Sequence, residues 1–170
     1  MSQFSLGYGY FTAPEGDNSI VLRLKEDQDG AEPSGNSISC LNLLRLAAYT
    51  SDEKKYQDLA GQIIKSYKTT LEKFPVALPA LASGLMMFDK SPLQIIISGP
   101  DDEAKPLIDA VNSLLLPQKI LIRAKPGSKL TLELLKDIPK DKTKAYVCQN
   151  FTCSQPVSTP EELVKLIQKE

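Results

Sequence analysis

The chain has 170 residues, enough for one ordinary domain or two small ones, and 20 basic against 21 acidic residues give a formal net charge of -1. No sustained block of either charge is present, so nothing favours nucleic acid as a partner. Histidine is absent, which excludes Ser/His/Asp and Cys/His nucleophilic catalysis within this chain.

The N-terminal sequence, the length of the apolar stretches and the number of cysteines indicate the compartment of the protein. The first residues, MSQFSLGYGYF, lack the basic region and apolar run of a secretion signal. No stretch approaches the roughly 20 apolar residues of a membrane span. Three cysteines, an odd number, fit a reducing compartment better than a secreted disulfide framework. We therefore expect a cytoplasmic protein without a membrane partner.

The first predicted element is a β-hairpin. Residues 8–12 (YGYFT) and 19–25 (SIVLRLK) are rich in β-forming side chains, and the turn formers APEGDN separate them. The stretch 28–37, QDGAEPSGNS, then leads into the run SISCLNLLRLAAYT. That run is apolar almost all round, which predicts a helix buried on most sides.

Two further helices follow in the first half. Thr50 and Glu53 have the spacing of a capping box, and apolar residues recur at helical spacing from Tyr56 to Phe74. This pattern predicts a partly exposed outer helix. The segment PALASGLMMF, from Pro79, predicts a buried inner helix with proline in its first turn.

The pattern changes near residue 90. The apolar runs LQIIISGP, KILIRA and AYVCQN predict three strands, and the segments DDEAKPLIDAVNSLLL, SKLTLELLKDI and TPEELVKLIQK predict helices after them. In the last helix Thr159, Pro160 and Glu162 form an N-terminal capping signature. Alternation of strands and helices favours a small, mostly parallel three-stranded α/β unit.

Several of these segments resemble, in the same order, the C-terminal part of the spermatogenesis-associated, thioredoxin-domain-containing protein family. The densest motifs are DGAEPSGNS and AYVCQNFTCSQPV, and the resemblance extends from about Gly7 to the end of the chain. It implies an upstream thioredoxin-like domain and a six-hairpin (α/α) barrel similar to that of N-acylglucosamine 2-epimerases. The fold expected here is therefore α+β. Residues 1–90 form a hairpin and helices from an incomplete (α/α) barrel, and residues 91–170 form the small α/β unit.

The DGAEPSGNS motif has two interpretations. In the structural one, Gly30 and Gly35 permit turns, and Ser34 or Asn36 caps the buried helix. In the functional one, helix starts in an (α/α) barrel border a central cavity. Asp29 and Glu32 are then candidate catalytic carboxylates, with Asn36 and Ser34 as substrate-binding groups. By similarity to epimerase barrels, the substrate is a small carbohydrate.

Cys148 and Cys153 are the redox candidates. Their spacing differs from a thioredoxin CxxC, and a zinc site fails because only Cys40 remains as a further thiol ligand. They are either a small apolar strand residue and a loop residue, with free thiols, or a redox-responsive pair. We expect no metal and no cofactor.

The favoured function is a non-catalytic C-terminal module that completes a carbohydrate-type barrel and lines its cavity. Its partners are then the upstream thioredoxin-like and barrel regions of a longer protein. The alternatives are an accessory region of a thiol-disulfide oxidoreductase and a stand-alone α/β interaction module. Because the helix from Ser37 to Tyr49 is apolar nearly all round, we expect an exposed apolar patch and self-association of the isolated chain.

Overall fold

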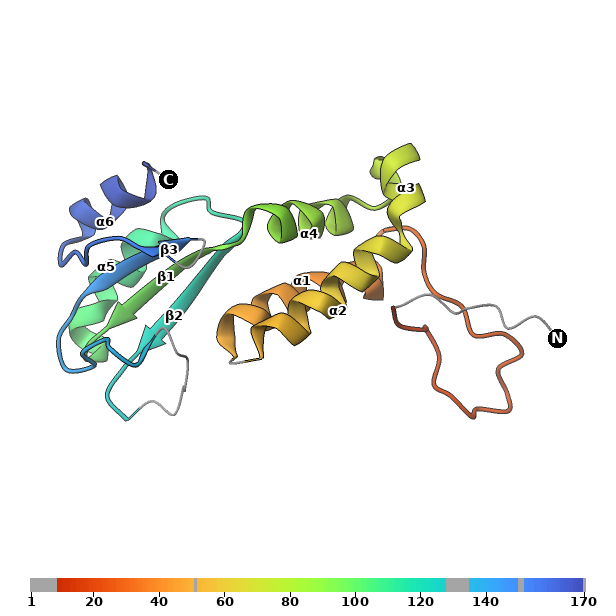
Figure 1. Cartoon of the computed structure of the whole chain (residues 1–170), viewed down its shortest axis with the longest axis horizontal. Coiled ribbons are helices and arrows are strands. Elements are labelled where there is room, and N and C mark those ends of the chain that lie inside the picture. Colours follow the sequence, from red (N-terminus) through yellow and green to blue (C-terminus); the bar gives the residue numbers. More distant parts are fainter. Residues whose placement is uncertain (1–8, 51, 128–134, 150–151, 170) are drawn as a thin grey trace. The chain divides into compact units, whose positions relative to one another are not determined.

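The computed structural model describes residues 9–50, 52–127, 135–149 and 152–169. The chain divides into two compact units (Figure 1). The first comprises residues 1–47 and 52–90, and the second comprises residues 48–51 and 91–170. Whether the two units are independently folding domains stays a prediction.

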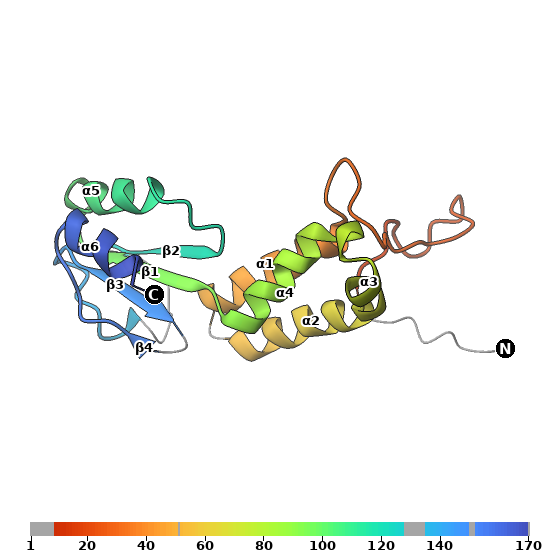
Figure 2. The same ribbon diagram turned by 90° about the horizontal axis from the view of Figure 1, so that it is seen from above.

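The first unit is helical. Its elements are α1 (Gly35–Tyr49), α2 (Glu53–Ser66), α3 (Lys68–Lys73), the 3-10 turn η1 (Pro75–Ala77) and α4 (Pro79–Lys90). Helices α1, α2 and α4 lie side by side, as the two views in Figures 1 and 2 show. Their buried apolar side chains are Cys40, Leu43, Leu44, Ala47, Ala60, Ile63, Leu81 and Met87.

The helices predicted from Ser37 and from Pro79 are confirmed as α1 and α4, although α1 is less buried than its apolar sequence predicted. A small residue explains how closely the two approach. A Cβ atom added at Gly84 of α4 would lie 3.1 Å from the Cys40 sulfur of α1. Cys40 is fully buried there, and burial raises the pKa of its thiol to about 12. Glycine thus lets the two inner helices pack at a distance that a larger residue would not permit.

The predicted outer helix differs from the structure at both ends. Asp52 is the N-cap of α2, and it makes no side-chain capping bond, so the capping box at Thr50 and Glu53 is wrong. Among the described residues the buried Thr50 hydroxyl has no hydrogen-bond partner. The helix breaks at Tyr67, whose hydroxyl donates to the Glu26 carbonyl at 2.8 Å. Periodicity alone does not reveal that contact.

The predicted N-terminal β-hairpin does not form regular strands in the described residues 9–27. The two segments do approach each other, since the Thr12 amide donates to the Leu24 carbonyl at 2.8 Å. The Thr12 hydroxyl donates to the same carbonyl at 3.1 Å. Residues 9–27 therefore lack the continuous ladder of backbone hydrogen bonds that the predicted hairpin requires. β-forming side chains alone do not set the register of such a ladder.

The second unit is a mixed sheet with helices. Strands β1 (Leu93–Ser98), β2 (Lys119–Ala124), β3 (Ala145–Gln149) and β4 (Thr152–Cys153) form one sheet in the order β2-β1-β3-β4. The helices are α5 (Asp101–Asn112) and α6 (Pro160–Ile167). Strands β1 and β2 are parallel, whereas β3 is antiparallel to both β1 and β4.

The α+β class is thereby confirmed, but the mostly parallel, three-stranded sheet is wrong. The β1-α5-β2 crossover gives the one parallel pair among the described strands, as expected for a βαβ unit. The connection from β2 to β3 is long enough for either strand direction. The alternation of strands and helices therefore does not determine whether β3 is parallel or antiparallel to its neighbours. Most of the helix predicted at 128–138 lies outside the described residues.

Residues 95–98 of β1 are all buried, which explains how the unit is held together. Ile95 and Ile97 pack with α5 and α6, in a core cluster that also contains Leu107, Val111 and Leu163. Ile96, between them, is equally buried, and neighbouring strand residues point to opposite faces of a sheet. The strand is therefore covered on both faces, as its continuous apolar run predicted.

The last helix begins as its sequence predicted. The Thr159 hydroxyl accepts a hydrogen bond from the Glu162 amide at 3.3 Å, and Pro160 occupies the first helical position. The Glu162 carboxylate accepts in turn from the Ser158 amide at 3.3 Å. Across the described part of the chain, no helix has both the length and the apolar character needed to cross a membrane.

Candidate functional site

The DGAEPSGNS motif is an ordered turn centred on the Asp29 carboxylate. One oxygen, Oδ1, accepts a hydrogen bond from the Ser34 amide at 2.8 Å, and Oδ2 accepts from the Ala80 amide at 2.8 Å. The Asp29 amide donates to the Ala77 carbonyl at 2.7 Å. Asp29 therefore joins the turn before α1 to the first turn of α4.

The Asp29 charge is stabilised by these contacts. Partial burial raises the pKa of Asp29, but hydrogen bonds from the Ser34 and Ala80 amides and from the Ser37 hydroxyl outweigh that effect. Its pKa is consequently below the ordinary value for aspartate. A general acid requires the opposite shift, so these contacts favour a structural role for Asp29.

Ser34, a predicted substrate-binding residue, caps α1. It is buried, its Oγ accepts from the Ser37 amide at 3.1 Å, and its hydroxyl donates to Ser37 Oγ at 2.9 Å. Glu26 completes the helix start, because its carboxylate accepts from the Gly35 amide at 3.1 Å. Two of the amides at the α1 start that lack partners within the helix thus bond to side chains.

Asn36, the other predicted substrate-binding residue, is buried and holds the N-terminal segment. Its Oδ1 accepts from the Tyr10 amide at 2.7 Å, and its Nδ2 donates to the Tyr10 carbonyl at 3.0 Å. Gly9 has a φ of 116°, and a Cβ there would lie 2.7 Å from Asn36 Oδ1. Both functional groups of the Asn36 amide are therefore occupied by backbone.

Glu32 has a different environment. Its side chain is exposed and borders a concavity of about 890 Å³. The lining residues are polar, charged or small for the most part, and they are Thr12, Leu24, Lys25, Glu26, Asp27, Gln28, Gly30, Ala31, Glu32, Pro33 and Gly35. Among the described residues, no group of three or more histidine, cysteine, aspartate or glutamate side chains could hold a metal ion.

The structure brings the redox candidates together. Cys148 and Cys153 form a disulfide with their Cα atoms 4.0 Å apart, and they are directly paired across β3 and β4. Cys148 is buried in the strand, whereas Cys153 is exposed. Burial of Cys148 agrees with its interpretation as a strand residue, but the bond departs from the expectation of free thiols. Cys40 keeps a free thiol.

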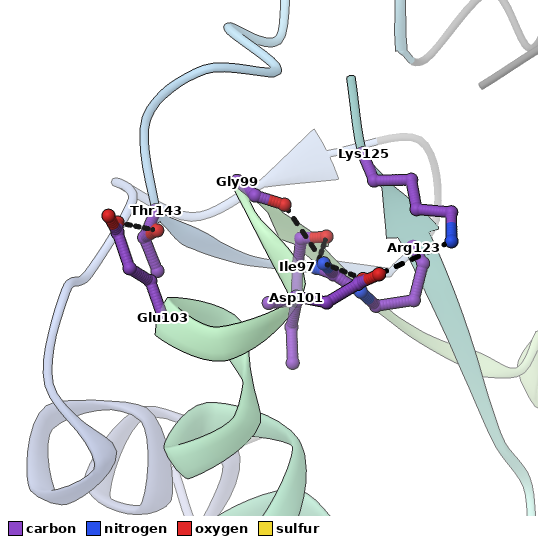
Figure 3. A network of polar contacts seen from close by, with 7 residues as sticks. All are labelled: Ile97, Gly99, Asp101, Glu103, Arg123, Lys125 and Thr143. Carbon is purple, nitrogen blue, oxygen red and sulfur yellow. Dashed lines mark hydrogen bonds and ion pairs between the residues drawn. The ribbon is translucent and has the colours of Figure 1, made fainter. Parts of the chain in front are cut away.

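A polar network that sequence analysis missed closes the end of β1 (Figure 3). The Arg123 guanidinium donates to the carbonyls of Ile97 and Gly99, at 2.5 and 2.9 Å, and pairs with Asp101 at 3.2 Å. Lys125 also pairs with Asp101, at 3.4 Å. The ion pairs with Arg123 and Lys125 hold the pKa of Asp101 below its ordinary value.

The contacts of Arg123 link residues at the carboxyl ends of the parallel strands β1 and β2 to one another. The carboxyl ends of parallel strands are common ligand sites in α/β folds. Here the Arg123 side chain bonds to backbone carbonyls and to an acidic side chain of the same unit, as Figure 3 shows. Near the same strand end, the Thr143 hydroxyl donates a hydrogen bond to the Glu103 carboxylate at 2.6 Å.

Comparison with known proteins identifies relatives of nearly the whole chain. It is 39% identical over 172 residues to spermatogenesis-associated protein 20 of Homo sapiens, and 37% identical over 174 residues to that of Rattus norvegicus. These alignments cover 96% and 97% of this chain but only 22% of each relative. An uncharacterized protein of Caenorhabditis elegans is 32% identical over 178 residues. No family model and no solved structure matches.

Proposed function

Because homologues named spermatogenesis-associated protein 20 match this chain over almost its whole length, we propose that it acts as a non-catalytic module of a larger protein of that family. The chain spans about a fifth of the length of these relatives, since the match covers 22% of each. In this proposal the first unit supplies inner helices to an (α/α) barrel, and the remaining hairpins come from the rest of the protein.

The observation that carries the proposal is apolar surface on both inner helices. On α1, Ile38 and Leu46 are 40% and 42% exposed, and their spacing of eight residues places them on the same side of the helix. On α4, Leu85 and Met86 are 38% and 56% exposed. An inner helix of an (α/α) barrel has neighbours on both sides, so such positions are covered in a complete barrel.

We expect this chain to bind the rest of the protein when the two are supplied as separate polypeptides. The partner is human spermatogenesis-associated protein 20 from which the matching segment has been deleted. Size-exclusion chromatography should recover a complex, because Ile38 and Leu46 are 40% and 42% exposed and covering the exposed part contributes on the order of 1 kcal/mol for each side chain. Leu46→Asp should lower recovery of the complex at least tenfold.

A matched control places the same charge on another exposed leucine. Leu115, after α5, is 95% exposed, and Leu115→Asp should leave recovery unchanged. The deleted human segment, supplied in trans, is the positive control. If that segment binds but this chain does not, or if both leucine variants bind equally well, the barrel proposal is contradicted.

The proposed ligand of the completed barrel is a small carbohydrate, and the concavity beside Glu32 is its proposed contact. Hydroxyl, amide and carboxylate groups line it, and these bond well to sugar hydroxyls. In the assembled complex, monosaccharides including N-acetylglucosamine should shift the amide resonances of Gly30 and Gly35. Glu32→Gln should reduce these shifts, whereas Glu72→Gln, on α3, should not. Absence of shifts across the panel would reject the sugar contact.

A further inference from the structure

The disulfide joins the short edge strand β4 to β3, beside hydrogen bonds in both directions between Val147 and Ser154. Strand β4 contains two described residues, Thr152 and Cys153, which pair with Gln149 and Cys148 of β3. Beyond it, the Ser154 amide donates to the Val147 carbonyl at 2.8 Å. The Cys148–Cys153 bond is thus a principal link between the exposed edge strand and the buried strand beside it.

The two sulfurs differ in what can reach them. Cys148 is 2% exposed and lies in a strand whose other face packs toward the core, whereas Cys153 is an exposed residue of the edge strand. Thiol-disulfide exchange requires a thiolate to approach one of the two sulfurs of the disulfide. The more exposed cysteine is therefore the one that is attacked. The difference in residue exposure favours attack at Cys153 over attack at Cys148.

The geometry points to a thiol-disulfide exchange site at Cys153, in which Cys148 is the buried leaving thiol and the co-substrate is a dithiol reductant. This inference does not rest on the proposed barrel function. It uses the pairing of the strands and the unequal exposure of the two cysteines. It also assigns a different role to each of the two cysteines.

The exchange has two steps that balance. A thiolate of the dithiol attacks Cys153 Sγ, the Cys148–Cys153 bond breaks, and Cys148 Sγ leaves with the electron pair and takes a proton from water. The second thiolate of the dithiol then attacks the dithiol sulfur of the mixed disulfide and releases Cys153 Sγ, which takes a proton from water. The chain gains two electrons and two protons, and the dithiol becomes a disulfide.

Reduction should loosen the edge strand without unfolding the unit. The bridge between Ala145 and Val157, with backbone hydrogen bonds of 2.8 and 2.9 Å, lies beyond the disulfide and remains in place. The Ser154 amide, which lies next to Cys153, loses the covalent link that holds it near Val147. Its hydrogen exchange should accelerate at least tenfold on reduction, whereas that of the Val157 amide should change little.

The test uses the full chain and single-cysteine variants. The wild-type chain is equilibrated with reduced and oxidised dithiothreitol or with glutathione buffers, and free thiols are labelled with a maleimide after denaturation. Cys148 and Cys153 should convert together as a two-electron couple. With oxidised glutathione, Cys148→Ser should form a mixed disulfide at Cys153 at least tenfold faster than Cys153→Ser forms one at Cys148.

Cys40 supplies an internal control, because its thiol is buried and should react slowly in every native sample. A comparison of the dithiothreitol and glutathione series distinguishes a dithiol co-substrate from a monothiol one. The inference is overturned if Cys148 and Cys153 stay free in the wild-type chain at every oxidised ratio. Equal adduct rates at Cys148 and Cys153 in the folded variants would also overturn it.

Discussion

Gly99→Ala should destabilise the second unit by about 3 kcal/mol, the largest effect expected of any single substitution considered for this chain. Gly99 has a φ of 97°, a conformation that residues with a Cβ rarely adopt. An added Cβ would also lie 2.8 Å from the Thr143 Cα atom. Backbone cannot move away as a flexible side chain can, so strain and overlap add. Urea unfolding followed by circular dichroism measures the loss.

Gly127→Ala is the matched control for this effect. Gly127 also has a positive φ, of 75°, but no heavy atom lies within 4 Å of the position that its Cβ would occupy. It should therefore show the backbone penalty alone, about 1–2 kcal/mol. If Gly99→Ala costs no more than Gly127→Ala, the close approach of Thr143 to the end of β1 is not a constraint in solution.

Asp29→Ala should destabilise the first unit by about 2–3 kcal/mol, because it leaves the Ser34 and Ala80 amides without their acceptor. Asp29→Asn should cost less, since a carbonyl oxygen can still accept one of the two bonds. Glu32→Ala is the control in the same motif, and as an exposed side chain it should change stability by less than about 0.5 kcal/mol. Equal losses for Asp29→Ala and Glu32→Ala would contradict the structural role.

The contribution of Asp29 to the free energy of unfolding depends on pH, and the lowered pKa of Asp29 determines the direction of that dependence. The folded-state pKa is lower than the ordinary value, so the folded chain binds fewer protons than the unfolded chain in that range. The stabilisation is present above the unfolded pKa and is lost as pH falls through the folded pKa. The difference in unfolding free energy between wild type and Asp29→Ala should therefore be constant near neutral pH and shrink in acid.

Local signals in the sequence predicted local structure well. The start of α6 at Thr159-Pro160 and the start of α4 at Pro79 follow from capping and proline preferences that operate within one turn. The sequence predicts that Ser34 or Asn36 caps α1, and in the structure Ser34 is the capping residue. These features need no knowledge of distant parts of the chain.

Contacts between distant segments were not predictable in the same way. The Asp29 bond to Ala80 spans 51 residues, and the Asn36 bonds to Tyr10 span 26. Hydrophobic periodicity contains no information about such polar pairs. The motif was recognised as dense in polar residues, but a carboxylate that caps a distant helix and a carboxylate that faces a ligand have the same sequence signature.

The sheet shows a related limit. The strands at 93–98, 119–124 and 145–149 were predicted from apolar runs, but strand direction depends on how the connections cross. The alignment of Cys148 with Cys153 follows from the antiparallel pairing of β3 with β4, which the sequence does not predict. Once that pairing is known, the register places the two cysteines opposite each other.

The central claim is that the Asp29 carboxylate of the DGAEPSGNS motif holds the starts of two helices together. The most direct measurement is an NMR titration of the Asp29 carboxyl carbon, with the Ser34 and Ala80 amides followed in the same spectra. We predict a pKa below the ordinary aspartate value, with both amide resonances shifting at the same midpoint. A pKa at or above the ordinary value, with neither amide responding, would contradict the account and return Asp29 to the list of acid-base candidates.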